Sequence, residues 1–157
     1  MGHETPRSTE ASDEHVWGEQ ARAERLVAAM LSRDAFSQWL GVEVMSIRPG
    51  ACTTRMTVRD DMVNGFGVAH GAIVFALADS AMAFASNGHG TVTVSVENSI
   101  TYPAPVRPGD VVTAVAEEEA GSTRLRYFRV TVHNQQGTTV ALFRGTVYRT
   151  QKELETE

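Results

Sequence analysis

The chain has 157 residues, of which 42% are hydrophobic and 21% are charged, and this length suggests one domain with a substantial core. No apolar run reaches the roughly 18 residues of a membrane span, and the polar start of the chain differs from a secretory signal, so a cytoplasmic protein is expected. The single cysteine, Cys52, excludes an internal disulfide and a cysteine metal cluster. Its strand-like surroundings favour a buried structural role.

The net charge of −5 is concentrated at the two ends of the chain. Residues 1–20 carry −4 and residues 150–157 carry −2, whereas residues 21–149 carry +1. A nearly neutral body argues against a nucleic-acid groove, so no nucleic-acid partner is expected. All 12 basic residues of that body are Arg, which suits a small ligand that bears phosphate.

The sequence predicts three parts: a disordered acidic leader at residues 1–14, one domain at residues 15–150 and a charged tail at residues 151–157. Within the domain, apolar residues at helical spacings predict a helix from about His15 to Arg33. A second short helix is expected over residues 34–40, and Gly41 is expected to end it.

A β-hairpin is expected next, with strands at residues 42–47 and 51–58 and a turn at Pro49-Gly50. A loop over residues 60–69 then leads into a strongly apolar helix. This central helix is expected from about His70 to Ser86.

Four runs rich in Val and Thr follow the expected helix stop at Asn87-Gly88, and the short turns between them favour an antiparallel meander. These runs are residues 91–102, 111–119, 124–134 and 138–149. One central helix with about six antiparallel strands gives an α+β fold class. Because the helix is apolar on nearly all sides, we expect the sheet to curl around it and a second subunit to cover the rest.

Asp79 is the most informative residue of the chain. Between Ala72 and Ala85 only Asp79 and Ser80 are polar. An unpaired carboxylate is costly to bury, and a desolvated carboxylate is a better base near neutral pH. We therefore expect Asp79 to act as a general base or a nucleophile. A structural ion pair with a buried Arg is the alternative.

Gly71 is the second candidate, because it stands at the expected N-terminus of the same helix. Its N–H is one of the unpaired donors of a helix start, and glycine allows close approach, so the position suits an oxyanion hole. Gly71 and Asp79 lie eight residues apart, or about 12 Å along the helix axis. Both can serve one site only if they come from different chains, which predicts two sites at a symmetric dimer interface.

Four neighbouring residues have a structural and a functional interpretation each. His70 either caps the helix or contacts substrate, and Asn64 belongs either to a turn or to the site. Ser80 either bonds its own helix or supports Asp79. For His89 a solvated loop position is favoured.

Several motifs occur in a fixed order: Asn64-Gly65, His70-Gly71, Leu77-Ala78-Asp79-Ser80-Ala81, Asn87-Gly88-His89-Gly90 and the run from Tyr102 to Asp110. Together they resemble the hotdog-fold acyl-CoA thioesterases of the phenylacetate-degradation (PaaI-like) type, over about residues 22–149. The resemblance implies a long central helix wrapped by an antiparallel sheet, in homodimers that pair into homotetramers. It also implies hydrolysis of an acyl-CoA thioester, commonly of phenylacetyl or hydroxyphenylacetyl groups.

The resemblance also implies a role for each residue of the motif. Asp79 would activate water or attack the carbonyl, and the Gly71 N–H would polarise the thioester oxygen. His70 would shape that turn or orient the thioester, and Asn64 would position water or the carbonyl. Ser80 would support the acid.

Three further points follow from the same motif. Gly65 and Phe66 are candidate substrate-binding residues. Phe66, Phe75, Met82 and Phe84 are candidates for the acyl pocket, with core packing favoured for most of these four. The familiar His-Gly-Gly pattern is broken by Ala72, which a first helical turn accepts. No metal spacing and no nucleotide-binding glycine pattern is present, so no metal is expected. The resemblance implies that coenzyme A is part of the substrate and that no cofactor is needed.

Two other functions stay open at this point. One is hydration or dehydration of an acyl thioester on the same fold, which would use a His and an acid at the acyl chain. The other is a non-catalytic acyl-CoA-binding module.

Overall fold

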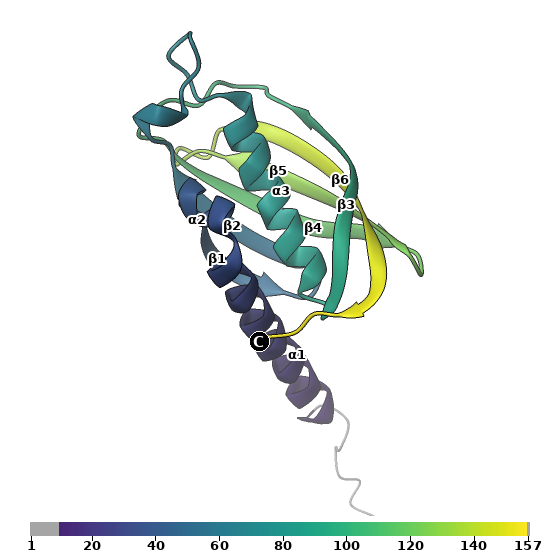
Figure 1. Ribbon diagram of the computed structural model, residues 1–157. Helices are drawn as coiled ribbons and strands as arrows, with labels where there is room; N and C mark the ends of the chain where they lie inside the picture. The colour runs from purple at the N-terminus through teal and green to yellow at the C-terminus, as the bar shows by residue number, and fades with distance from the viewer. Residues whose placement is uncertain (1–9, 157) are drawn as a thin grey trace, which may run out of the picture.

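A six-stranded antiparallel sheet curves around one central helix, α3 (Gly71–Asn87), in the computed structural model of the protein (Figure 1). The structure describes residues 10–156, with side chains from residue 16 onward. The predicted leader falls mainly on residues 1–9, which lie outside the described residues. Its last five positions belong to α1, so this helix begins before the predicted start at His15.

The other elements follow the predicted order closely. The helices are α1 (Glu10–Arg33), α2 (Ala35–Leu40), the short 3₁₀ helix η1 (Asp60–Met62) and α3. The strands are β1 (Glu43–Arg48), β2 (Ala51–Thr57), β3 (Thr91–Thr101), β4 (Val111–Gly121), β5 (Leu125–His133) and β6 (Thr139–Glu153). Strand β6 runs into the predicted charged tail because its end pairs with the start of β3, where Glu153 lies opposite Thr91.

The strand order, β1-β2-β4-β5-β6-β3, confirms only part of the predicted meander. Strands β4, β5 and β6 pair consecutively, but β3 pairs with β6 at the sheet edge and not with β4. The connection from β3 to β4 contains Pro103, Pro105 and Pro108. Proline fixes φ and donates no backbone hydrogen bond, which disfavours a tight hairpin between β3 and β4. The segment instead passes β6 and β5 in the strand order before β4 begins.

Helix α3 buries one face against the concave side of the sheet and leaves the other open. The buried face includes Leu77, Ala81 and Met82, all with 0% exposure, and it meets Phe128 and Val130 of β5 within one core cluster. The open face, called here the α3 stripe, holds six residues at helical spacing that are only half-buried or exposed: Ala72, Phe75, Ala76, Asp79, Ser80 and Ala83. The sheet therefore covers half of an apolar helix, as one curved sheet must.

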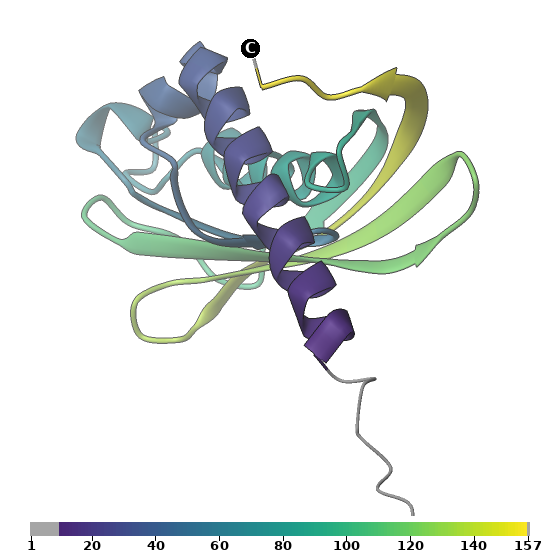
Figure 2. The same ribbon diagram turned by 90° about the horizontal axis from the view of Figure 1, so that it is seen from below.

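Helix α1 packs against β1, α2 and α3. Seen from below, it crosses one end of the sheet, and its N-terminal turns extend past the sheet (Figure 2). Trp17 on these turns is 68% exposed. Within residues 10–156, no helix combines the length and the apolar character that a membrane crossing requires.

Gly145 of β6 gives a test of this packing, because a Cβ there would lie 2.2 Å from Met82 Sδ and 2.6 Å from Asn98 Oδ1. We predict that Gly145→Ala lowers the free energy of unfolding by about 1–3 kcal/mol, measured by urea denaturation, since overpacking a filled core forces its neighbours to move. The matched control is Gly18→Ala, whose Cβ would meet nothing within 4 Å. Because Gly18 lies inside α1, that change is expected to stabilise by up to about 1 kcal/mol. Equal effects of the two substitutions would contradict the packing around Gly145.

Candidate active site

Asp79 lies in the middle of the α3 stripe, half-buried. Its one hydrogen-bond partner among the described residues is Asn98 of β3, whose Nδ2 donates to Asp79 Oδ1 at 3.3 Å. Burial raises the pKa of Asp79 above its ordinary value of 3.8, and the hydrogen bond from Asn98 opposes this rise with a smaller effect. Within residues 10–156 no Arg pairs with Asp79, so the predicted alternative of a structural ion pair is wrong for the described chain.

Asn98 was missed by sequence reasoning, because nothing in a strand-like run marks one polar residue as the partner of a distant acid. The same Nδ2 also donates to Ser95 Oγ at 2.8 Å. The two residues of β3 and the acid of α3 thus form one small polar group on an otherwise apolar face.

Gly71 begins α3, and the ring of Tyr102 packs directly on it. The Tyr102 hydroxyl donates to the Gly71 carbonyl oxygen at 2.8 Å, and a Cβ on Gly71 would lie 3.2 Å from that ring. The Gly71 N–H has no acceptor among the described residues. It lies beside an apolar cleft of about 350 Å³ whose lining includes Val68, Val74 and Pro103. The first turn of α3 therefore offers an unused donor next to a cleft.

His70 is the N-cap of α3, which is the structural role that the sequence left open. Its Nδ1 accepts a hydrogen bond from the Ala72 N–H at 3.1 Å, and its own N–H donates to the Met62 carbonyl oxygen at 2.8 Å. The cap binds the Ala72 N–H and leaves the Gly71 N–H without a hydrogen bond to His70. The His70 side chain is exposed at this end of the helix.

Asn64 forms the predicted turn. Its Oδ1 accepts from the Phe66 N–H at 2.9 Å, and its backbone N–H donates to the Val68 carbonyl oxygen at 2.8 Å. Its Nδ2 has no partner among the described residues. Gly65 is exposed beside it, and Phe66 is 93% exposed at the loop tip, so the core-packing alternative for Phe66 is wrong in the single chain.

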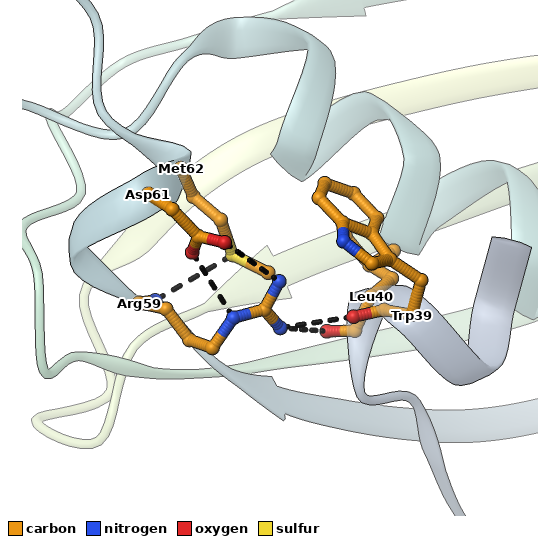
Figure 3. Close-up of polar contacts among 5 residues, drawn as sticks. All are labelled: Trp39, Leu40, Arg59, Asp61 and Met62. Atoms are coloured by element: carbon orange, nitrogen blue, oxygen red, sulfur yellow. Dashed lines mark hydrogen bonds and ion pairs between the residues drawn. The ribbon is translucent and has the colours of Figure 1, made fainter.

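Arg59, also missed from the sequence, ties this loop to the end of α2 (Figure 3). Its Nη1 donates to the Trp39 and Leu40 carbonyl oxygens at 2.9 and 3.4 Å, and its Nε donates to Asp61 Oδ1 at 3.0 Å. The guanidinium carbon lies 5.1 Å from the centre of the Trp39 ring. One side chain thus binds the free carbonyls of a helix end and the acid of η1, which fixes where the Asn64 loop starts.

Ser80 bonds neither its own helix nor Asp79. Its Oγ lies 3.1 Å from Ser37 Oγ, and Ser37 donates to Asp34 Oδ2 at 2.6 Å. Asp34 is the N-cap of α2, so Ser80 connects α3 to that cap. Ser80 therefore has no direct contact with Asp79, and any support that it gives to the acid is indirect, through the packing of α2 against α3.

His89 and Cys52 lie away from this group. His89 Nε2 lies 2.7 Å from Glu118 Oε2, and Glu118 also pairs with Arg126. The predicted solvated position of His89 is therefore wrong, because its side chain is half-buried and pairs with Glu118 of β4. Cys52 is buried, and burial raises the pKa of its thiol to about 12.

The site residues fall into two groups on one chain. Asp79 and Asn98 lie midway along α3, whereas Gly71, His70 and Asn64 lie at its N-terminal end. The rise of a helix puts the two groups about 12 Å apart. Within residues 10–156, no cluster of three or more His, Cys, Asp or Glu side chains is placed to hold a metal ion.

Comparison with known proteins supports this fold and identifies the family. Residues 66–141 match the model of the thioesterase superfamily. The chain is 36% identical over 121 residues to the acyl-coenzyme A thioesterase PaaI of Escherichia coli, covering 77% of this chain and 86% of that protein. It superposes on the solved E. coli PaaI structure with a TM-score of 0.84 and 33% identity, covering 87% and 99% of the two chains.

A variant of PaaI from Thermus thermophilus, a phenylacetic acid degradation protein, gives a TM-score of 0.72 and 40% identity, covering 74% of this chain and all of that one. The fold is thus the hotdog fold of thioesterases, as the sequence motif implied. The chain belongs to the PaaI-like family of the thioesterase superfamily.

The raised pKa of Asp79 gives a test that needs no substrate. Between 3.8 and the raised pKa the folded state binds more protons than the unfolded state, so stability falls as pH rises through that window. We predict that Asp79→Asn removes this loss and is more stable than the parent above the window, measured by urea unfolding at a series of pH values.

Asp110→Asn is the control of opposite sign. Hydrogen bonds from Gln135 and the Arg107 backbone lower the pKa of Asp110, so its ionised form stabilises the folded state above the unfolded pKa. This second variant should lose stability at neutral pH. A pH profile of Asp79→Asn parallel to that of the parent would contradict the environment described for Asp79.

Proposed function

We propose that this protein is an acyl-CoA thioesterase that hydrolyses aryl- or medium-chain acyl-CoA, of the phenylacetyl-CoA or hydroxyphenylacetyl-CoA type. The observation that carries the proposal is Asp79, a half-buried carboxylate of raised pKa on the open face of a helix whose first N–H is unused. The relatives named above, among them an acyl-coenzyme A thioesterase and a phenylacetic acid degradation protein, support the substrate class.

In the proposed reaction, Asp79 acts as general base or as nucleophile. As base it takes a proton from water, the water oxygen bonds to the thioester carbonyl carbon, and the carbon–sulfur bond breaks. The products are the carboxylic acid and the thiol of coenzyme A, which regains a proton. Burial favours this role, because raising the pKa of a carboxylate makes it a stronger base.

The Gly71 N–H is the proposed oxyanion donor. It stands at a helix N-terminus, where the unpaired donors and the helix dipole both favour negative charge. The Tyr102 hydroxyl holds Gly71 in place by its bond to the Gly71 carbonyl oxygen. The His70 cap binds the Ala72 N–H and leaves the Gly71 N–H available. Asn64 Nδ2, which has no partner among the described residues, is the proposed second donor. No cofactor or metal is required, and coenzyme A is part of the substrate.

The proposal includes a second copy of the chain, because neither group of site residues is complete alone. The α3 stripe is apolar apart from Asp79 and Ser80, and β3 is an edge strand with Val94 and Val96 exposed at 48% and 56%. An uncovered apolar helix face beside a free strand edge suits a symmetric partner. Antiparallel α3 helices would bring Asp79 of one chain to Gly71 of the other, in a homodimer that can pair into a homotetramer.

Loss of the acid tests the function. We predict that Asp79→Ala lowers kcat/KM by roughly 10²–10⁴-fold, because a positioned proton acceptor contributes about that much. The measurement is thiol release from phenylacetyl-CoA and a series of acyl chain lengths. Glu24→Gln, on the exposed surface of α1, is the control that should keep full turnover.

The same assay separates the alternatives. Unchanged turnover in Asp79→Ala would rule out the assigned role of that residue. Water addition to crotonyl-CoA without thiol release would support the hydratase, and binding without either reaction would support the binding module.

The Gly71 N–H is tested by a pair of variants. Gly71→Pro removes the donor, and proline is accepted at the first position of a helix, after the extended His70 backbone (φ −61°, ψ 135°). Gly71→Ala meets Tyr102 with the same Cβ but keeps the N–H. We predict that the proline variant loses roughly 10²–10³-fold in kcat, as removal of an oxyanion donor does, and that the alanine variant keeps most activity.

Mixing subunits tests the shared site. If Asp79 and Gly71 act across the dimer, a mixed dimer of Asp79→Ala and Gly71→Pro chains has one intact site, so mixing two inactive proteins should restore turnover. Failure of well-mixed dimers to regain activity would show that the two residues do not act across the interface.

A further inference from the structure

Strand β3 carries a β-bulge beside Asp79. Ser95 lies opposite Val147 of β6, but Glu97 lies opposite Thr146, so Val96 is the extra residue. In a regular strand Ser95 and Asn98 would point to opposite faces, because side chains alternate. The bulge resets this alternation and turns both toward α3, where they share a hydrogen bond.

The amide of Asn98 is oriented for a carboxylate. Its two N–H groups serve Asp79 Oδ1 at 3.3 Å and Ser95 Oγ at 2.8 Å. Its Oδ1 is buried and has no partner among the described residues. Turning the amide over would place that oxygen against the carboxylate, so an ionised Asp79 selects the orientation seen.

Gly145 provides the space for this arrangement. It lies opposite Asn98 in the β3–β6 ladder, and a Cβ there would lie 2.6 Å from Asn98 Oδ1. The bulge aims Asn98 inward, and the missing side chain across the ladder lets the amide lie under α3.

We propose that Asn98 is a positioning residue, which holds the Asp79 carboxylate ionised and directed toward the open side of α3. Ser95 anchors the amide, and the bulge at Val96 sets its direction. The consequence for turnover rests on the proposed function, but the effect on Asp79 itself does not.

Among the side chains that the structure describes, no other charged group contacts Asp79. Asp79 is the sole charged residue of α3. The buried side chains that β2, β4 and β5 turn toward α3 are apolar, apart from Thr54. The nearest elements carry Asp34, bound to Ser37 at the start of α2, Glu97 on the exposed side of β3, and Arg144 of β6, paired with Glu119. The pKa of Asp79 accordingly responds to burial, which raises it, and to Asn98, which lowers it.

The test is the titration of Asp79 in Asn98→Leu, which removes the donor at similar size. Carbon-13 NMR of the side-chain carboxyl, assigned with Asp79→Asn, should show a higher pKa than in the parent protein. Asn98→Ala removes the same donor and replaces Asn98→Leu in the test if the leucine variant does not fold. Ser99→Ala, on the exposed side of the same strand, is the matched control that should leave the titration of Asp79 unchanged.

The pH profile of thiol release is the second readout. In Asn98→Leu the acidic limb of kcat/KM should move to higher pH, with a loss of roughly tenfold on that limb and less than about threefold on the plateau, as expected for loss of a hydrogen bond to a charged group. A merely structural role would lower the whole profile without moving it.

The outcomes separate this inference from the proposed function. An unchanged Asp79 titration in both folded Asn98 variants overturns the inference, whatever the activity. A raised pKa in a protein that releases no thiol supports the inference and overturns the proposed function. A raised pKa with a shifted acidic limb supports both.

Discussion

The arrangement of this protein depends on one constraint: an antiparallel sheet can cover only one side of an apolar helix. Leu77, Ala81 and Met82 fill the covered side of α3. The α3 stripe remains on the other side, where Asp79 is neither in water nor sealed in the core. That intermediate position explains the direction of its pKa shift, since partial burial raises the pKa of a carboxylate. The same open side is the face assigned to the proposed subunit contact, so the position of the acid and that contact share one physical cause.

The N-terminal end of α3 is held by contacts that leave one donor unused. His70 takes the Ala72 N–H, Tyr102 takes the Gly71 oxygen, and Arg59 anchors the preceding loop to α2. The cap on the Ala72 N–H and the Arg59 bonds to the last carbonyls of α2 satisfy polar groups that helix ends leave unpaired. The Tyr102 hydroxyl is an additional donor to the Gly71 oxygen. What remains is the Gly71 N–H beside an apolar cleft, a suitable place for a developing negative charge. Pre-arranged donors of this kind act without reorganising during the reaction.

Local patterns predicted the elements well and the long-range contacts poorly. The apolar run gave α3, Gly41 ended α2 with φ 82°, and the alternating runs gave the six strands. The meander that would pair β3 with β4 was wrong, since β3 pairs with β6. The choice of strand partner depends on where the proline-rich connection leads, which local spacing does not record. Asn98, Arg59 and the Glu118 partner of His89 were missed for the same reason. Each contacts a residue far away in the chain, and no spacing within one element records such a pair.

Burial and the Asn98 hydrogen bond have opposite effects on the pKa of Asp79, and both effects would grow if the open side of α3 were covered. A partner chain and an acyl group would both remove water from the carboxylate, and each removal raises its pKa further. A base whose pKa rises too far is protonated at neutral pH and accepts no proton from water. A donor already aimed at the carboxylate opposes that change, and its effect grows as the surroundings become less polar. The bulge at Val96 and the absent side chain at Gly145 cost regular pairing and packing in β3 and β6. Those costs fall next to the half-buried Asp79, where the donor of Asn98 opposes the effect of burial on the pKa of the acid.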